Sequence, residues 1–180
     1  MLVACSVLAP LAPLAACSDK SGSVDGSSAS SPLVPASDEL PLRVELIGPA
    51  VAALEAKLGG PQQYLEVNAT PTLVNLFVAV ENATKAVAYV YIGGALGDPA
   101  PPEGVKAGAP TFDASKIAFN YKRVLEPVLA ALPASTYRVF SVVGVAGGAV
   151  SYLVTVQSSK GGELQVPVKA DGSIIGAVQN

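Results

Sequence analysis

A helical pattern followed by three β-rich runs occurs twice in this sequence, and this order constrains the fold more than any other feature. In the first occurrence, four apolar residues share one face of a helix: Ile47, Val51, Leu54 and Leu58. Gly59 and Gly60 end this helix, because glycine readily adopts the left-handed conformation at a helix C-terminus. We expect strands over residues 64–69, 73–80 and 87–92, which turn residues separate.

The second occurrence follows residues 98–112, a Gly- and Pro-rich stretch that is typical of a connector. The apolar residues that predict its helix are Val124, Leu125, Val128, Leu129 and Leu132. Pro127 lies within this pattern, so we expect it to kink the helix or to mark the start of a second segment. Strands are predicted over residues 137–143, 150–157 and 163–170. Pro167 has no backbone N–H, which predicts that the last strand is an edge strand.

We therefore predict an α+β fold of two tandem α-β-β-β units, residues 41–97 and 113–180, with helices packed on one face of antiparallel sheets. The two sheets lie side by side or merge. The alternative is that the internal match is a coincidence of the kind that any α+β protein offers. Gly93-Gly94 and Gly172 occupy corresponding turns, and we expect Gly172 to adopt a positive φ.

The N-terminal residues 1–16 are uncharged and apolar, but they are fewer than the about 20 residues that a membrane-spanning helix needs. Proline interrupts them twice, so they indicate an export signal peptide. The final residues, Leu14-Ala15-Ala16-Cys17, resemble the lipobox of bacterial lipoprotein precursors. In that family the cysteine thiol receives a diacylglyceryl group and becomes the mature N-terminus, which implies lipidation, palmitate included, at Cys17. The alternative is an ordinary buried cysteine in an N-terminal helix.

Residues 17–40 are expected to form a lipid-anchored, flexible Ser/Gly-rich linker, because eight of the twenty residues 18–37 are serine. No Lys or Arg precedes the apolar run, although signal peptides normally begin with a positive segment, so we expect the true start codon upstream. Together these features predict a domain held at the extracytoplasmic face of the cell membrane.

The composition excludes several classes of function. The net charge is −3 and the basic residues are scattered along the sequence, which excludes a nucleic-acid-binding protein. The chain has no histidine, and its two cysteines, Cys5 and Cys17, both lie in the N-terminal segment, so we expect neither a metal site nor a cofactor. Asp98, Glu103 and Asp171 could coordinate calcium, but no EF-hand pattern is present and turn positions explain them better.

The sequence contains only weak candidates for catalytic groups, so we expect a protein that is not an enzyme. Ser115-Lys116 and Ser159-Lys160 have the residue types of a Ser-Lys dyad, but neighbours in sequence point apart on a strand, and surface roles suit them better. Tyr89 and Tyr91 share one strand face. Their side chains either pack on the core or form a binding face.

The whole arrangement resembles a group of actinobacterial cell-envelope lipoproteins, in which a lipobox and a Ser/Gly spacer precede two units of a helix and strands. The matching stretches are LAAC at 14, YIGG at 91, PTFDASKIAF at 110 and ADGSI at 170. Each unit also resembles the PepSY and β-lactamase-inhibitor-like folds. These resemblances imply inhibitory, assembly or ligand-sensing modules, and therefore binding rather than chemistry.

From the sequence we expect a membrane-anchored lipoprotein that acts as a non-catalytic binding or scaffold module of the cell envelope, with an envelope protein or a lipid as its partner. An alternative, suggested by the 51% hydrophobic content, is a carrier that holds an apolar ligand between its helices and its sheet. A third hypothesis, an envelope hydrolase that uses Ser-Lys or paired carboxylates, is the least favoured.

Overall fold

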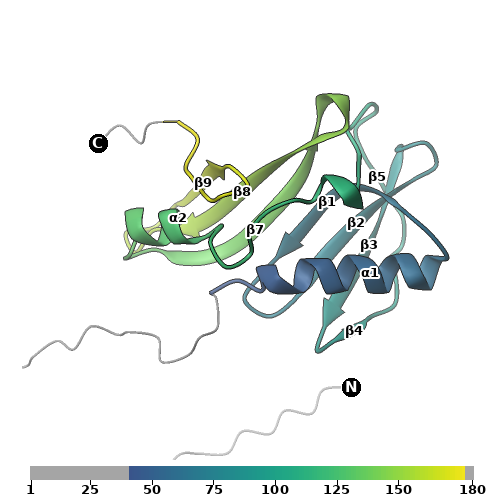
Figure 1. Cartoon of the computed structure of the whole chain (residues 1–180). Coiled ribbons are helices and arrows are strands. Elements are labelled where there is room, and N and C mark those ends of the chain that lie inside the picture. Colours follow the sequence, from purple (N-terminus) through teal and green to yellow (C-terminus); the bar gives the residue numbers. More distant parts are fainter. Residues whose placement is uncertain (1–40, 177–180) are drawn as a thin grey trace, which may run out of the picture. The chain divides into compact units, whose positions relative to one another are not determined.

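A computed structural model of the chain describes residues 41–176 (Figure 1). The expected signal peptide, the lipidation site Cys17 and the linker at 17–40 lie outside these residues. The described part begins with the 3-10 turn η1 (Val44–Leu46), which continues directly into helix α1 (Ile47–Leu58). Gly59 ends α1 with a φ of 80°, as its position in the sequence predicts.

The described residues contain one sheet of nine strands, in which every pair of neighbours is antiparallel. The strands are β1 (Gln63–Ala69), β2 (Val74–Val80), β3 (Lys85–Ile92), β4 (Ala95–Leu96), β5 (Glu103–Gly104), β6 (Phe112–Asp113), β7 (Thr136–Val145), β8 (Ala149–Gln157) and β9 (Glu163–Val168). The six long strands, β1–β3 and β7–β9, confirm the six predicted runs. Between them lie the short helices η2 (Ala114–Lys116), α2 (Glu126–Ala131) and η3 (Ala146–Gly148).

The strand order, β4-β3-β2-β1-β7-β8-β9, corrects one prediction. The α+β class and the antiparallel pairing are confirmed, but the two tandem units are wrong. The first strand of each expected unit pairs with the other, β1 with β7, from Glu66 opposite Val143 to Ala69 opposite Phe140. The two groups of three strands therefore do not form separate sheets, but are joined into a single continuous sheet.

The second predicted helix is much shorter than the sequence pattern suggests. The helix α2 contains six residues, residues 121–125 before it form turns, and residues 117–120 are irregular. Pro127 lies in the first turn of α2, where its missing N–H costs no hydrogen bond, so it marks the start of a helical segment. Val124 and Leu125 are buried although they precede the helix, so the apolar pattern reported burial correctly and helix length incorrectly.

One face of the sheet is covered and the core lies beneath the cover. The helix α1 contacts β1, β2 and β4, and it buries Ile47, Ala50 and Leu54. Figure 1 shows α1 in front of the β1–β3 half of the sheet and α2 in front of the β7–β9 half. One cluster of buried side chains runs under both covers, from Tyr91 on β3 to Val166 on β9.

The segment between η2 and α2 is attached to the second half of the sheet by Tyr152. Its hydroxyl accepts a hydrogen bond from the Ala118 N–H at 3.0 Å and donates one to the Ala118 carbonyl at 3.1 Å. The ring of Phe119 packs beside it, with its centroid 5.0 Å from that of Phe140 and 5.6 Å from that of Tyr152. An irregular segment, rather than a helix, therefore covers much of β7 and β8.

Both edges of the sheet are partly protected. Gly97 and the start of the Gly- and Pro-rich connector run along β3 and donate backbone hydrogen bonds to it, from Gly97 to Val90 and from Ala100 to Ala88, each at 2.8 Å. The strand β9 ends the sheet on the other side, as Pro167 predicts. The Pro167 carbonyl there accepts a hydrogen bond from the Ile175 N–H, because the chain turns back at Gly172, whose φ is 88° as expected.

Candidate binding face

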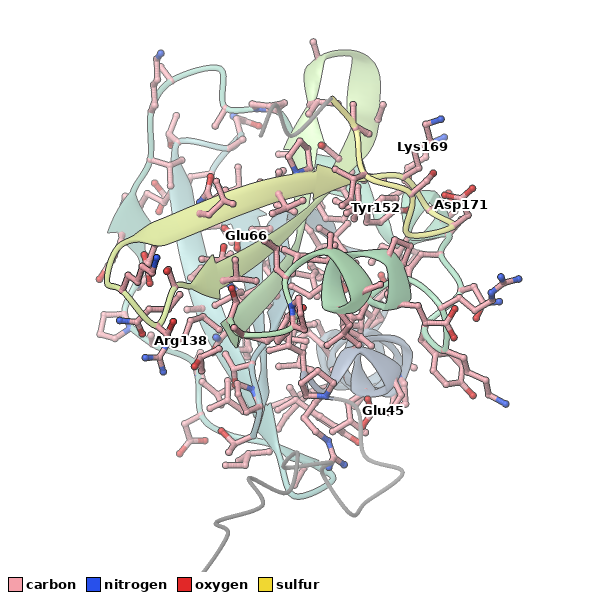
Figure 2. All side chains as sticks on the ribbon, turned by 90° about the vertical axis from the view of Figure 1, so that its left-hand side faces the viewer. Glu45, Glu66, Arg138, Tyr152, Lys169 and Asp171 are labelled. Carbon is pink, nitrogen blue, oxygen red and sulfur yellow. The ribbon has the colours of Figure 1, made fainter. Side chains whose placement is uncertain are left out.

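The second face of the sheet carries no helix in the described part of the chain. We call this surface the open face and define it by nine side chains that alternate with the core residues of their strands: Glu66 and Asn68 on β1, Asn75 and Phe77 on β2, Ala88 and Val90 on β3, Ser141 and Val143 on β7, and Leu153 on β8. Figure 2 shows Glu66 over the sheet, and Glu45 beside α1 on the other side of the sheet. Ser141 is buried, and the other eight are partly exposed.

A chain of polar side chains crosses the centre of the open face from β2 to β7. The Asn75 side-chain amide donates to the Asn68 carbonyl oxygen at 2.9 Å, and the Asn68 amide donates to the Glu66 carboxylate at 2.9 Å. The Ser141 hydroxyl donates to the same carboxylate oxygen, Oε1, also at 2.9 Å. These bonds hold Glu66 in place at the junction of the two halves of the sheet.

A β-bulge explains why Glu66 lies on this face. The register shifts between Tyr64, which pairs with Val78, and Glu66, which pairs with Phe77. In a regular strand, residues 64 and 66 would point to the same side of the sheet. The bulge inserts Leu65, so that Tyr64 is fully buried in the core while Glu66 faces outward.

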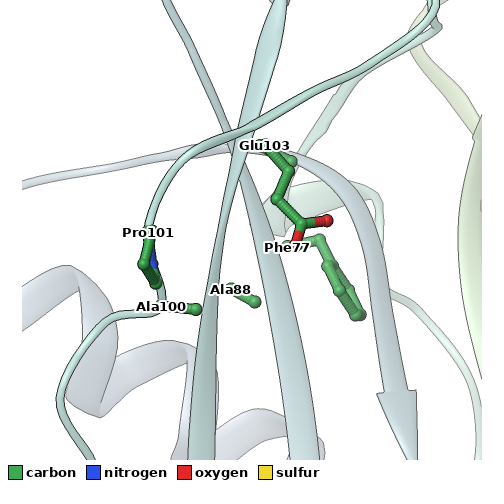
Figure 3. A pocket seen from close by; sticks show the side chains of 6 residues that line it. Phe77, Ala88, Ala100, Pro101 and Glu103 are labelled. Atoms are coloured by element: carbon green, nitrogen blue, oxygen red, sulfur yellow. The ribbon is translucent and has the colours of Figure 1, made fainter.

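Beside Glu66, a shallow pocket of about 160 Å³ opens between the sheet and the connector (Figure 3). Its lining is one aromatic ring, a small apolar surface and one carboxylate: Phe77, Ala86, Ala88, Ala100, Pro101 and Glu103. Glu103 pairs with Ala86, so its side chain is on the same side of the sheet as Phe77, which lies opposite Glu66 on β2. Two carboxylates therefore flank Phe77 on the open face.

The accessible charge at the centre of the open face is negative. Both hydrogen bonds that Glu66 accepts go to Oε1, and no described residue donates to Oε2, which leaves that oxygen for a donor from outside. Arg138 lies at the far end of the face, where its guanidinium binds the Gln157 side chain. An incoming basic side chain would meet apolar surface and carboxylates here, which is favourable for a lysine or arginine.

The structure places the other candidates away from one another. The Ser115 hydroxyl donates to the Asp113 carboxylate and not to Lys116, and this hydrogen bond is the main cause that lowers the pKa of Asp113. Ser159-Lys160 lies in the exposed turn between β8 and β9. Neither pair forms a dyad. Asp171 has a similar turn role, in which Ser173 donates to it and lowers its pKa.

Tyr89 and Tyr91 are core residues. They are 8% and 7% exposed and belong to the buried cluster on the covered face of the sheet, which is the first of the two alternatives for them.

Among residues 41–176, no three acidic side chains, Asp98, Glu103 and Asp171 included, gather into a group that could hold a metal ion. Within the same residues, no helix has the length and hydropathy to cross a membrane.

Two buried tyrosines have altered acidity. Burial raises the pKa of Tyr64, and the Glu55 carboxylate, which accepts a hydrogen bond from its hydroxyl at 3.3 Å, raises it further. Burial alone raises the pKa of Tyr137, whose hydroxyl has no hydrogen-bond partner in the described residues. Both groups lie on the core side and belong to the fold rather than to the open face.

Comparison of this chain with protein-family models, with curated proteins and with solved structures gives no match. The candidate site therefore rests on the geometry of the open face alone. Glu66, Asn68 and Ser141 are not among the site residues predicted from the sequence, although the pattern of Glu66-Val67-Asn68-Ala69 indicates where two of them point. Its polar residues alternate with apolar ones, which places two polar side chains together on the outer face of a strand.

Proposed function

We propose that this protein is a lipid-anchored, non-catalytic binding module of the bacterial cell envelope, and that the open face holds a protein partner through a basic side chain. The proposal combines two expectations from the sequence, the anchor at Cys17 and the lack of catalytic groups, with the open face. The resemblance to actinobacterial envelope lipoproteins and to PepSY and β-lactamase-inhibitor-like modules is in keeping with this function.

The observation that carries the proposal is the Glu66 network. A carboxylate fixed by Asn68 and Ser141, with one oxygen accessible, is a preorganised acceptor, so a partner's lysine or arginine would bind without the cost of ordering it. The side chains of Phe77, Val143 and Leu153 surround this centre with apolar surface. Apolar area around a directional polar contact is the usual composition of a protein interface.

The filled space beneath α1 weighs against the alternative, a carrier of an apolar ligand between helix and sheet. Leu54 of α1 and Val67, Leu76 and Phe140 of the sheet are fully buried in one continuous cluster. A lipid chain would have to displace these side chains. The Ser-Lys form of the hydrolase hypothesis has less support still, because the Ser115 hydroxyl donates to Asp113 rather than to Lys116, and Ser159-Lys160 lies in an exposed turn.

Copurification from native membranes tests the proposal. The full chain is isolated from its host as wild type, as Leu153→Arg on the open face and as Ala56→Arg on the exposed side of α1. We expect one protein to copurify with the wild type and with Ala56→Arg and to be lost with Leu153→Arg. A partner that is retained by Leu153→Arg, or no partner in any sample, would contradict the proposal.

A further inference from the structure

A groove of about 270 Å³ lies on the covered side of the sheet, where the two covers meet. The start of α1 forms one wall and the segment before α2 forms the other. Its lining is mostly apolar and aromatic: Val44, Glu45, Ile47, Gly48, Pro49, Ile117, Phe119 and Tyr121. The groove exists because an irregular segment, and not a full-length second helix, follows η2.

The rim of this groove is aromatic and basic. Tyr121 is 44% exposed, and the Lys122 ammonium lies 5.8 Å from the centre of its ring. Lys116 is exposed on the same segment. Although the whole chain carries a charge of −3, three of its basic residues fall within residues 116–123.

The acidic groups near the groove are paired. The Glu45 carboxylate forms an ion pair with the Arg43 guanidinium at 2.8 Å, and the Glu126 carboxylate lies 3.5 Å from the Arg123 guanidinium. Among the described residues these pairs cancel, and the Asp113 carboxylate interacts electrostatically with Lys116, so Lys122 leaves the rim with a net positive charge. The surface is therefore apolar and aromatic at its centre and positive at its rim, which complements the anionic headgroup region of a membrane.

The point at which the chain enters the described domain also favours a membrane as the binding partner of this groove. Residue 41 is the first described residue, and Val44 and Glu45 already line the groove. Residues 17–40, the expected tether, thus join the domain beside this surface. A lipid at Cys17 would keep the domain at high local concentration near the bilayer, so that weak contacts of this surface suffice.

We propose that this groove, with Tyr121 and Lys122 at its rim, is the surface on which the anchored domain rests on an anionic lipid membrane. The proposal depends on the proposed function, because it requires the anchor at Cys17. Since the groove is on the covered side of the sheet, a domain resting in this way directs the open face away from the bilayer. The Glu66 network would then be accessible to a partner.

The absence of tryptophan from the chain permits a direct test, because a single introduced tryptophan is the only one present. Tyr121→Trp reports on the groove, and Ile92→Trp, at a site 51% exposed on the opposite side of the sheet, is the control. The lipidated full chain is bound to phosphatidylcholine vesicles with roughly one quarter phosphatidylglycerol and nitroxide lipids labelled near the headgroup. Quenching of tryptophan fluorescence is measured, together with flotation of the protein with the vesicles.

We expect the fluorescence of Tyr121→Trp to be quenched about threefold more strongly than that of Ile92→Trp, since aromatic side chains favour the membrane interface. Adding Lys116→Glu and Lys122→Glu to Tyr121→Trp should reduce quenching to the control level, while flotation and the melting temperature are unchanged.

Several results would overturn the inference. If the protein floats but both tryptophans are quenched equally, the resting surface is wrong while the anchor stands. A blue-shifted but unquenched Tyr121→Trp would mean that the chain itself or a second copy covers the groove. If the wild-type chain does not float, the anchor fails and the resting surface fails with it.

Discussion

The Ser141 hydroxyl donates a hydrogen bond of 2.9 Å to the Glu66 carboxylate, across the strand pair that joins the two halves of the sheet. Ser141 is 8% exposed, so its hydroxyl has little access to water. The same bond therefore stabilises the centre of the fold and orients the carboxylate of the candidate binding face.

Substitutions at these two residues should separate stability from binding. Ser141→Ala removes one donor to a carboxylate and is expected to lower the free energy of unfolding by about 1–2 kcal/mol. Glu66→Gln keeps a side-chain oxygen that can accept from Ser141 and Asn68, so its stability should stay within about 0.5 kcal/mol of the wild type. Urea denaturation measures both. Glu66→Gln should nevertheless weaken partner binding, and unchanged binding would show that the charge has no role.

Gly144 marks a close approach between β7 and the connector. A Cβ atom at this position would lie 2.4 Å from the Pro110 carbonyl oxygen, so Gly144→Ala forces the backbone apart. We expect a loss of about 2–3 kcal/mol, which is the usual range for overpacking. Gly104→Ala is the matched control, because nothing lies within 4 Å of its Cβ position. Equal melting temperatures for the two variants would contradict this account of Gly144.

Two buried tyrosines should respond in opposite ways to the loss of a hydroxyl. The Tyr137 hydroxyl is buried without a hydrogen-bond partner in the described residues, so Tyr137→Phe should leave stability unchanged or raise it by up to about 1 kcal/mol. Tyr152→Phe removes the two bonds to Ala118 and should cost about 1–3 kcal/mol. Calorimetry of the two variants tests this, and the reverse order would contradict the assigned contacts.

The acidity of Tyr64 predicts sensitivity to alkali. Its pKa is raised in the folded state, so the unfolded chain loses this proton first, at pH values above the usual tyrosine pKa of about 10. Below that pH the tyrosine is protonated in both states, so its titration does not change the free energy of unfolding. Above it, the free energy of unfolding should fall by up to about 1.4 kcal/mol per pH unit for this residue. Tyr64→Phe should therefore show a shallower decline between neutral pH and pH about 11, and an equal decline would exclude this residue as the cause.

Local patterns predicted the elements of this fold better than their assembly. The spacing from Ile47 to Leu54 and the glycine at residue 59 located α1, and alternation located the six long strands, because both signals depend on neighbours in sequence. The pairing of β1 with β7 joins residues about 75 positions apart, and no local pattern encodes it. The sequence could therefore not decide between two sheets and one.

The candidate site could not be predicted for a similar reason, because two of its features have no local mark in the sequence. Glu66 faces outward beside a bulge, and a bulge has no reliable mark in the residues around it. Its partner Ser141 comes from the distant strand β7. Tyr89 and Tyr91, the most visible aromatic residues of the strands, proved to be core residues, because an aromatic side chain on an amphipathic strand points inward more often than outward.

The central claim is that the open face is the binding surface of an envelope-anchored module. The most direct measurement is photocrosslinking in the living host, with a photoreactive amino acid placed at Val90 or Leu153 on the open face and at Ala56 on α1. We predict one discrete crosslinked species from both open-face positions and none from Ala56. Crosslinks from Ala56 alone, or the same diffuse products from all three positions, would contradict the claim.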